Sequence, residues 1–195
     1  AKQGIYNSIA AYLGIVVGAI NTIVLFPNFF SPDEFGLTRV LYAAAVLGAS
    51  VFAFGMPNVM LKFFPAFRDK EKGHNGILFF IMSVPLIGYL LFAVCSLVFK
   101  PEIVEHYAEQ SNLFEEYFNY ILVFAAYMIY FNLFDAYLRA LYKTVIYSFL
   151  QNVVLRLGWM MLIIMYYYQW IDFEQFMFYY VNVYALLLTI IVIYT

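Results

Sequence analysis

The chain has 195 residues, of which 66% are hydrophobic and 11% are charged, and its formal net charge is −2. Soluble domains carry roughly 45–50% apolar and about 25% charged residues, so this composition excludes an ordinary soluble domain and predicts that lipid surrounds most of the chain. The single cysteine, Cys95, excludes an internal disulfide, and no cluster of cysteine and histidine predicts a metal site.

Six runs of residues are long and apolar enough to cross a membrane, which takes about 20 residues in a helix. They predict an all-α integral membrane protein in which residues 1–195 form one six-helix membrane domain. The expected spans cover 5–26, 35–56, 77–99, 118–141, 145–168 and 173–194. The chain begins without methionine and stops inside an apolar run, so we expect it to be part of a longer protein.

The first expected span carries small residues on one helical face. Gly14 and Gly18 form a GxxxG pair, and Pro27 ends the span. Because small residues let two helix backbones approach closely in lipid, we interpret the pair as a packing surface for another helix. The turn after this span is acidic, and the second span ends at Gly55-Met56-Pro57 in front of a basic loop.

Lysine and arginine are strongly segregated between the two sides of the six expected spans. One side carries Lys100, and the other carries seven basic residues: Lys2, Lys62, Arg68, Lys70, Lys72, Arg139 and Lys143. Cytoplasmic loops are enriched in lysine and arginine, so we expect the amino terminus in the cytoplasm of a bacterial inner membrane protein. Nine acidic residues fall on the opposite side: Asp33, Glu34, Glu102, Glu105, Glu109, Glu115, Glu116, Asp172 and Glu174.

Aromatic residues make up 22% of the chain, and many fall near the ends of the expected spans. Rings with an apolar body and a polar tip favour the headgroup layer, which predicts an interfacial belt. The expected belt includes Phe29, Phe30, Phe35, Tyr107, Phe114, Tyr117, Phe118, Tyr166, Tyr167, Tyr168 and Trp170. Tyr127 and Tyr130 lie in mid-span, where stacking on a sugar ring is the alternative role.

Charged side chains inside a span are costly, roughly 2.5–3.5 kcal/mol on insertion scales, so each one needs a partner or a task. Arg156 lies near the middle of the fifth span. Either it faces a polar cavity that receives an anionic substrate group, or it hydrogen-bonds to Asn132 or Asp135 in the fourth span. Arg39, about one turn into the second span, either lines the outer half of a cavity or reaches the headgroups.

Asp135 and Arg139 are spaced i,i+4 on one face of the fourth span, near its cytoplasmic end. This spacing predicts a local ion pair. The alternative role is a cytoplasmic gate or a carboxylate that binds a coupling ion. No nucleophile with a base, metal-ligand set or phosphate-binding glycine loop is present, so we expect neither enzyme activity nor a cofactor.

Two stretches, in their order and spacing, resemble bacterial polysaccharide and oligosaccharide flippases of the multidrug/oligosaccharidyl-lipid/polysaccharide exporter superfamily. The first runs SPDEFGLTRVLYAAAVLGASVFAFGMPNVMLKFFPAFRDKE from Ser31, with its Pro32–Gly36 turn followed by a span and a basic loop. The second, AYLRALYKTVIYSFLQNVVLRLGWMMLI from Ala136, is similar to the turn between the fourth and fifth spans of that family.

The resemblance implies that the six spans form the amino-terminal lobe of a two-lobe, V-shaped transporter. It implies a carrier that flips undecaprenyl-diphosphate-linked oligosaccharide from the cytoplasmic to the periplasmic leaflet, with lipid as its surroundings and no nucleic acid partner. Arg39 and Arg156 match, by depth, the cationic residues thought to receive the diphosphate in such carriers. H⁺ or Na⁺ is the candidate coupling ion.

Three other functions remain open from the residues. A drug/cation antiporter of the same superfamily needs carboxylates within the spans, where Asp135 is the one available. A membrane enzyme of glycan assembly needs catalytic residues on a large outer loop, whereas the loop at 100–117 is modest and acidic. A membrane scaffold without transport activity would leave Arg156 with a structural role.

Overall fold

The long apolar runs form helices, because a helix satisfies every backbone hydrogen bond internally where lipid offers none. The computed structural model describes residues 2–68, 76–108 and 113–195, and these residues contain no β-strand. Six helical stretches are long and apolar enough to cross a membrane: Gln3–Phe29, Pro32–Phe52, Ile77–Val98, Asn119–Ala140, Thr144–Tyr167 and Phe173–Tyr194. The predicted all-α membrane class with six spans is therefore confirmed at this level.

The chain forms two compact units. Unit 1 comprises Ala1–Thr38 and Lys143–Thr195, and unit 2 comprises Arg39–Tyr142. The helices of unit 1 are α1 (Lys2–Ala19), α2 (Phe26–Phe29), α9 (Thr144–Phe149), α10 (Leu155–Tyr167) and α11 (Phe173–Tyr194). Those of unit 2 are α4 (Met56–Phe67), α5 (Ile77–Val98), α6 (Lys100–Ala108), α7 (Leu113–Tyr117) and α8 (Asn119–Ala140), while α3 (Pro32–Phe52) begins in unit 1 and continues into unit 2.

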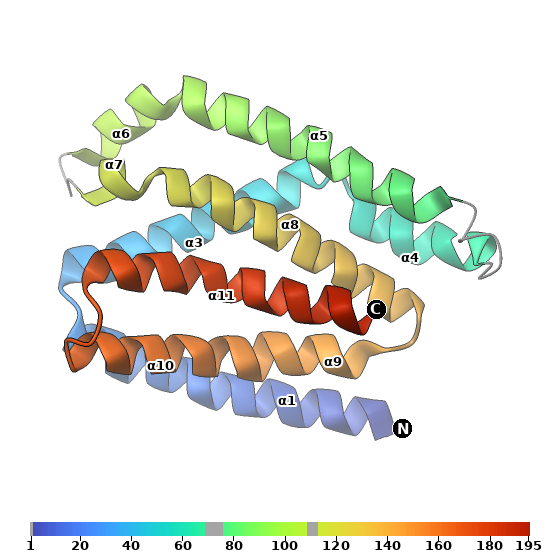
Figure 1. Cartoon of the computed structure of the whole chain (residues 1–195), viewed down its shortest axis with the longest axis horizontal. Helices are drawn as coiled ribbons and strands as arrows, with labels where there is room; N and C mark the ends of the chain where they lie inside the picture. The colour runs from blue at the N-terminus through green and yellow to red at the C-terminus, as the bar shows by residue number, and fades with distance from the viewer. Residues whose placement is uncertain (1, 69–75, 109–112) are drawn as a thin grey trace. The chain divides into compact units, whose positions relative to one another are not determined.

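In unit 1, the first span packs alongside the fifth, and the two run in the same direction (Figure 1). The contacts are spread along the length of the pair in nearly constant register, with partners 137 or 138 residues apart in the sequence. The pairs are Asn7 with Thr144, Gly14 with Asn152, Gly18 with Arg156 and Phe29 with Tyr167. Two parallel spans cross the membrane in the same direction, so the chain between them must cross the membrane an odd number of times.

In unit 2, the second crossing is a broken helix. Helix α3 ends at Phe52, Phe54 and Gly55 adopt left-handed φ angles of 49° and 68°, and α4 then continues onward (Figure 1). A Cβ on Gly88, near the middle of α5, would collide with the Phe52 carbonyl oxygen, so the break lies midway along α5. Counting α3 and α4 as one crossing, with α5 and α8, gives the odd number that the parallel pair in unit 1 requires.

The beginning of the expected basic loop after residue 56 is helical, which corrects the prediction of a loop there. Met60 and Phe64 are fully buried, one helical turn apart, and they pack in a cluster with residues of α5 and α8. This unit 2 cluster consists of Met60, Phe64, Ile81, Leu133, Ala136 and Tyr137. Lys62 lies on the other face, so the pattern is that of an amphipathic helix broken away from α3.

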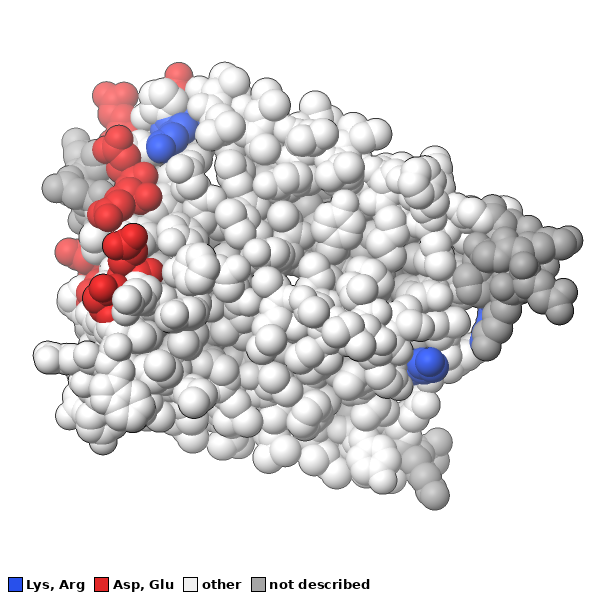
Figure 2. Space-filling view, in the orientation of Figure 1, with Lys and Arg blue, Asp and Glu red and all other residues white. Residues whose placement is uncertain are grey.

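The connection at 100–117 contains two short helices, α6 and α7, among its described residues. Their acidic side chains, Glu102, Glu105, Glu115 and Glu116, belong to this end of unit 2. On the face shown in Figure 2, the acidic side chains lie at the ends of the helices, and no charged side chain is visible along the middle of the helices. Lys70, Lys72 and Glu109, which the expected orientation uses, lie outside the described residues.

Candidate functional site

A line of polar and small residues joins the first and fifth spans of unit 1. We call it the polar seam, and it consists of Asn7, Gly14, Gly18, Asn21, Thr144, Asn152 and Arg156. A Cβ on Gly14 would lie 2.8 Å from the Cβ of Asn152, and a Cβ on Gly18 would collide with the Arg156 guanidinium. The predicted GxxxG packing surface is therefore confirmed, and its partner is the fifth span.

Arg156 lies midway along the 24-residue span Thr144–Tyr167, where its side chain crosses the groove that Gly18 leaves open. Its Nη1 donates a hydrogen bond to the carbonyl oxygen of Gly14. The backbone carbonyl of Arg156 accepts a 2.8 Å hydrogen bond from Nδ2 of Asn21. The residue is half-buried, so the seam holds the guanidinium at one nitrogen without enclosing it.

Both helices of the seam contain π-helical turns beside Arg156. They cover Ile20–Leu25 in the first span and Leu150–Val154 in the fifth. Such turns widen the helix by one residue and are frequent at functional sites. Asn21 is the second residue of the first π-helical turn, and Asn152 is the third residue of the second. The irregular backbone therefore coincides with two of the polar residues.

The seam also contains polar atoms without partners. Among the described residues, the buried Oδ1 atoms of Asn7 and Asn21 accept no hydrogen bond, although their Nδ2 atoms donate to Thr144 Oγ1 and to the Arg156 carbonyl. A buried acceptor left unpaired is unfavourable by about 1–3 kcal/mol. The seam is therefore polar within an otherwise apolar unit, and the two Oδ1 atoms can each accept a hydrogen bond from a further donor.

The structure places the other predicted site residues in unit 2. Asp135 and Arg139 form the predicted i,i+4 ion pair, with the Asp135 side chain 10% exposed and that of Arg139 53% exposed. Arg39 is half-buried in the second turn of α3. Within unit 1, the hydrogen bond of Arg156 goes to Gly14 in the first span, because the glycine groove brings that backbone within reach. The expected partners Asn132 and Asp135 belong to unit 2, and a bond from Arg156 to either stays a prediction.

The aromatic belt is confirmed only in part. Tyr167, Tyr168 and Trp170 are 53%, 61% and 73% exposed, as a belt requires. The belt prediction is wrong for Phe30, Phe114, Tyr117 and Phe118, which are buried. Their rings pack against other rings, for example Phe30 on Tyr166 at 4.5 Å, so aromatic packing replaces contact with headgroups.

Mid-span Tyr130 packs beside the unit 2 cluster, and its hydroxyl donates a 3.4 Å hydrogen bond to the Met82 carbonyl. This contact anchors α8 to α5. The alternative role of Tyr127 and Tyr130 in stacking on a sugar stays a prediction.

Sequence reasoning identified Arg156 but missed the residues that hold it. Asn21 is one of several neutral polar residues in the apolar runs, and no sequence pattern marks a π-helical turn. The Gly14/Gly18 pair was the available signal, because it marked the face of the first span that another helix approaches. No family model, no curated protein and no solved structure matches this chain.

Proposed function

We propose that this chain is one lobe of a membrane carrier that moves a lipid-linked anionic substrate between the leaflets of a bacterial inner membrane. In this proposal the substrate is an undecaprenyl-diphosphate-linked oligosaccharide, and the two-lobe, V-shaped architecture follows the resemblance. The observation that carries it is Arg156, a half-buried guanidinium held midway along a candidate span by a main-chain carbonyl.

The charge distribution of unit 1 supports a task for Arg156. Beyond the first helical turn, the three spans at Gln3–Phe29, Thr144–Tyr167 and Phe173–Tyr194 contain no other charged residue. A cation at that depth is energetically costly, so its presence points to a function. A guanidinium presents five N–H donors, and here Nη1 is the one with a hydrogen-bond partner among the described residues.

The chemistry of a diphosphate fits those remaining donors. Arginine binds phosphate oxygens through two parallel hydrogen bonds and neutralises charge at the same time. The prenyl chain of such a substrate stays in the hydrocarbon, so only the headgroup needs a polar path. No bond is made or broken in this transport step, and the proposal assigns no catalytic residue.

The parallel pair of spans supports the proposed orientation. The first and fifth spans begin at the same end of unit 1, where Lys143 lies, while Asp33, Glu34, Asp172 and Glu174 belong to the opposite end. With lysine and arginine on the cytoplasmic side, the amino terminus is cytoplasmic. Arg156 then lies about halfway between the leaflets, where a headgroup in transit has lost most of its water.

The experiment separates charge from hydrogen bonding at Arg156. The full-length gene is expressed in a bacterial host whose own polysaccharide flippase is deleted, as wild type, Arg156→Lys and Arg156→Gln. Glutamine keeps an N–H donor for the Gly14 carbonyl but removes the charge, whereas lysine keeps both. Surface polysaccharide, cytoplasmic lipid-linked precursor and membrane abundance are measured together.

We expect Arg156→Gln to reach the membrane at normal abundance, to lose export at least tenfold and to accumulate precursor. Arg156→Lys should retain a substantial part of the export. Equal export by wild type and the glutamine variant would contradict the proposal and leave Arg156 as a residue that only joins the two spans.

A further inference from the structure

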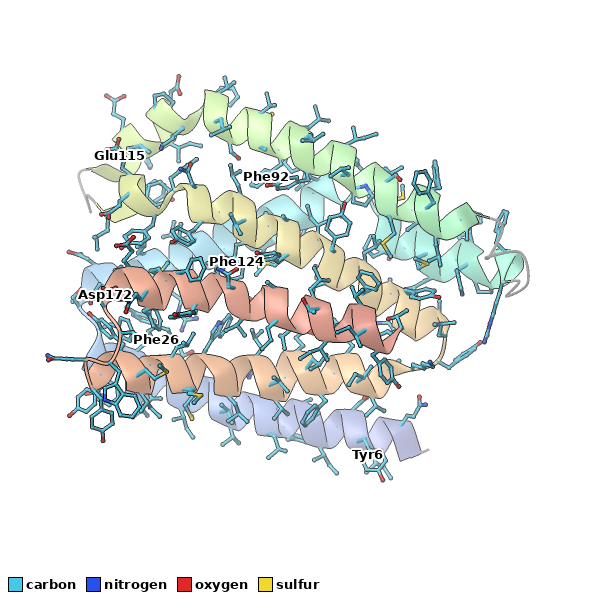
Figure 3. All side chains as sticks on the ribbon, in the orientation of Figure 1. Tyr6, Phe26, Phe92, Glu115, Phe124 and Asp172 are labelled. Carbon is cyan, nitrogen blue, oxygen red and sulfur yellow. The ribbon has the colours of Figure 1, made fainter. Side chains whose placement is uncertain are left out.

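A cavity of about 640 Å³ lies in unit 1 where α10 turns back into α11, away from the polar seam. Its apolar walls are the rings of Phe29, Tyr166, Tyr167, Trp170 and Phe173. Figure 3 shows aromatic side chains gathered at this end of α10, close to the labelled Asp172. The volume is within the usual range for small-molecule sites, which combine aromatic walls with a few placed polar groups.

The rings of the cavity wall are fixed before any ligand binds. Phe29 stacks on Tyr167 with ring centroids 4.2 Å apart. The Tyr166 hydroxyl donates a 2.8 Å hydrogen bond to Oε1 of Glu34, which holds its ring from behind. Trp170 is 73% exposed, so most of its surface is available to a ligand.

The turn that carries Trp170 has a residue in an unexpected conformation. Gln169, the second residue after α10, has a left-handed φ of 58°, at a position where glycine is the usual residue. Its N–H donates to the Tyr166 carbonyl at 2.9 Å, and the Trp170 N–H donates to the Met165 carbonyl at 3.0 Å, which completes a Schellman motif. Glutamine is unfavourable there compared with glycine, and its side chain lines the cavity.

Two further polar side chains line the cavity from the start of α11. Asp172 and Gln175 form a capping box, in which Gln175 N–H donates to Asp172 Oδ1 at 2.7 Å and Asp172 N–H donates to Gln175 Oε1 at 3.3 Å. The box uses one oxygen of each side chain. The second carboxylate oxygen of Asp172 and the amide nitrogen of Gln175 remain for a ligand.

We infer that this cavity binds a neutral saccharide ring. A sugar presents an apolar C–H face that matches an aromatic wall, and hydroxyls that both donate and accept hydrogen bonds. The amide of Gln169 donates and accepts, the amide nitrogen of Gln175 donates, and the second carboxylate oxygen of Asp172 accepts. Among the residues that the structure describes, no lysine or arginine lines the cavity, which disfavours an anion, and an organic cation would leave both amide nitrogens unused. The inference does not rest on the transport proposal, because it uses a different set of residues.

Gln169 provides a sharp test, because a structural role and a binding role predict opposite results. If Gln169 only closes the turn, Gln169→Gly relieves a left-handed glutamine, stabilises the protein and leaves binding unchanged. If Gln169 binds a sugar, the same variant is as stable or more stable but binds less. Tyr142→Gly is the matched control, since Tyr142 also has a left-handed φ, of 60°, and does not line the cavity.

The full chain is purified in detergent and titrated calorimetrically with neutral trisaccharides of glucose, galactose, mannose and N-acetylglucosamine, and separately with choline. We expect saturable binding of at least one trisaccharide, at least tenfold weaker in Gln169→Gly and Trp170→Ala and unchanged in Tyr142→Gly. Thermal unfolding should show Gln169→Gly to be no less stable than wild type.

Three results would overturn the inference: no saturable binding of any trisaccharide, equal binding by wild type and Gln169→Gly, or saturable binding of choline alone. The last result would assign the cavity to a cation, and the first would leave these rings as part of the interfacial belt. Because the readout is binding by the purified chain, a failure here is distinguishable from a failure of the export assay on Arg156.

Discussion

The two units hold their helices together by different means. In unit 1, the first and fifth spans meet through the polar seam, where glycines bring two backbones close and amide and guanidinium groups bond to main-chain carbonyls. In unit 2, α4, α5 and α8 meet through the unit 2 cluster, whose members are almost completely buried and, apart from Ala136, large. Lipid provides no hydrophobic drive between helices, so the first arrangement relies on hydrogen bonds and the second on shape.

The difference has a consequence for the break between α3 and α4. Helix α4 has 12 residues, too few to cross a membrane alone, so packing against α5 and α8 must keep it in place. Gly88 lets the Phe52 carbonyl approach α5 at the break. Discontinuous helices of this kind occur at the binding sites of transporters, with the irregular backbone protected inside the protein. We therefore expect the unit 2 cluster to be sensitive to lost volume, and the glycines of the polar seam, like Gly88 at the break, to added volume.

The largest effect should follow from Phe64→Ala in the unit 2 cluster. Phe64 is fully buried, and its ring meets Tyr137 edge-on at 5.1 Å. Removing a buried phenylalanine side chain costs about 3–5 kcal/mol through lost contacts and the cavity that remains. SDS titration in mixed micelles measures the loss, and Phe63→Ala, at a neighbouring residue 45% exposed, is the matched control. Similar losses for both variants would show that α4 does not pack as described.

Gly14→Ala should have the next largest effect, and it tests the opposite sensitivity in unit 1. The added methyl would meet the backbone carbonyl and Cβ of Asn152, which cannot move without moving the fifth span. Overpacking of this kind costs typically about 1–3 kcal/mol. Gly4→Ala is the control, because nothing lies within 4 Å of its Cβ position.

Gly18→Ala refines the same measurement. Its methyl would meet the Arg156 side chain, whose far end can shift, so the loss of stability should be smaller than for Gly14→Ala. Export should suffer more than stability, since the guanidinium would be displaced. Equal stability of Gly14→Ala and wild type would contradict the close approach of the two spans.

Asn21→Leu should have a smaller effect, of about 0.6 kcal/mol, which is the average for interhelical hydrogen bonds in membrane proteins. The substitution removes the bond to the Arg156 carbonyl, but it also removes an Oδ1 atom that is buried without a partner among the described residues. The two contributions oppose each other. Asn28→Leu is the control, because exposed Asn28 bonds, among the described residues, to Val24 one turn earlier in the same span. A loss above 2 kcal/mol would mean that Asn21 Oδ1 is satisfied in the membrane.

Much of the fold was predictable because one physical rule controls it. Apolar runs of membrane length must be helical, so the number of spans and their approximate limits could be read from the sequence. The break after Phe52 was predictable as an end of a span, from Gly55-Met56-Pro57, but not as the start of α4. That helix depends on Met60 and Phe64 finding a surface on α8, which is a tertiary contact.

The candidate site was predictable only at its charged residue. Arg156 is conspicuous in an apolar run, whereas its partner is a main-chain carbonyl, which no sequence pattern marks. The cavity near Gln169 was hidden for a similar reason. Its aromatic residues look like an interfacial belt, and the left-handed φ of Gln169 appears only in three dimensions. The Asp172-x-x-Gln175 spacing was a readable capping box, but a cap does not by itself indicate a ligand.

The smallest effect should come from the ion pair between Asp135 and Arg139, the polar contact of unit 2 that resembles the seam of unit 1. The Arg139 side chain is 53% exposed, so solvent or headgroups screen the pair, and i,i+4 pairs on helices contribute about 0.3–0.5 kcal/mol. A double-mutant cycle with Asp135→Asn and Arg139→Gln, measured by SDS titration, should give a coupling energy in that range. A coupling above 1.5 kcal/mol would place a polar contact among the main stabilising interactions of unit 2, and the contrast between the units would fail.

The same variants in the export assay test the role of the pair as a gate. If Asp135→Asn stops export while the coupling energy stays small, the carboxylate acts in transport and its bond to Arg139 is incidental. If export and stability are both nearly unchanged, the pair is a local surface contact, and the polar chemistry of the described residues is concentrated in unit 1.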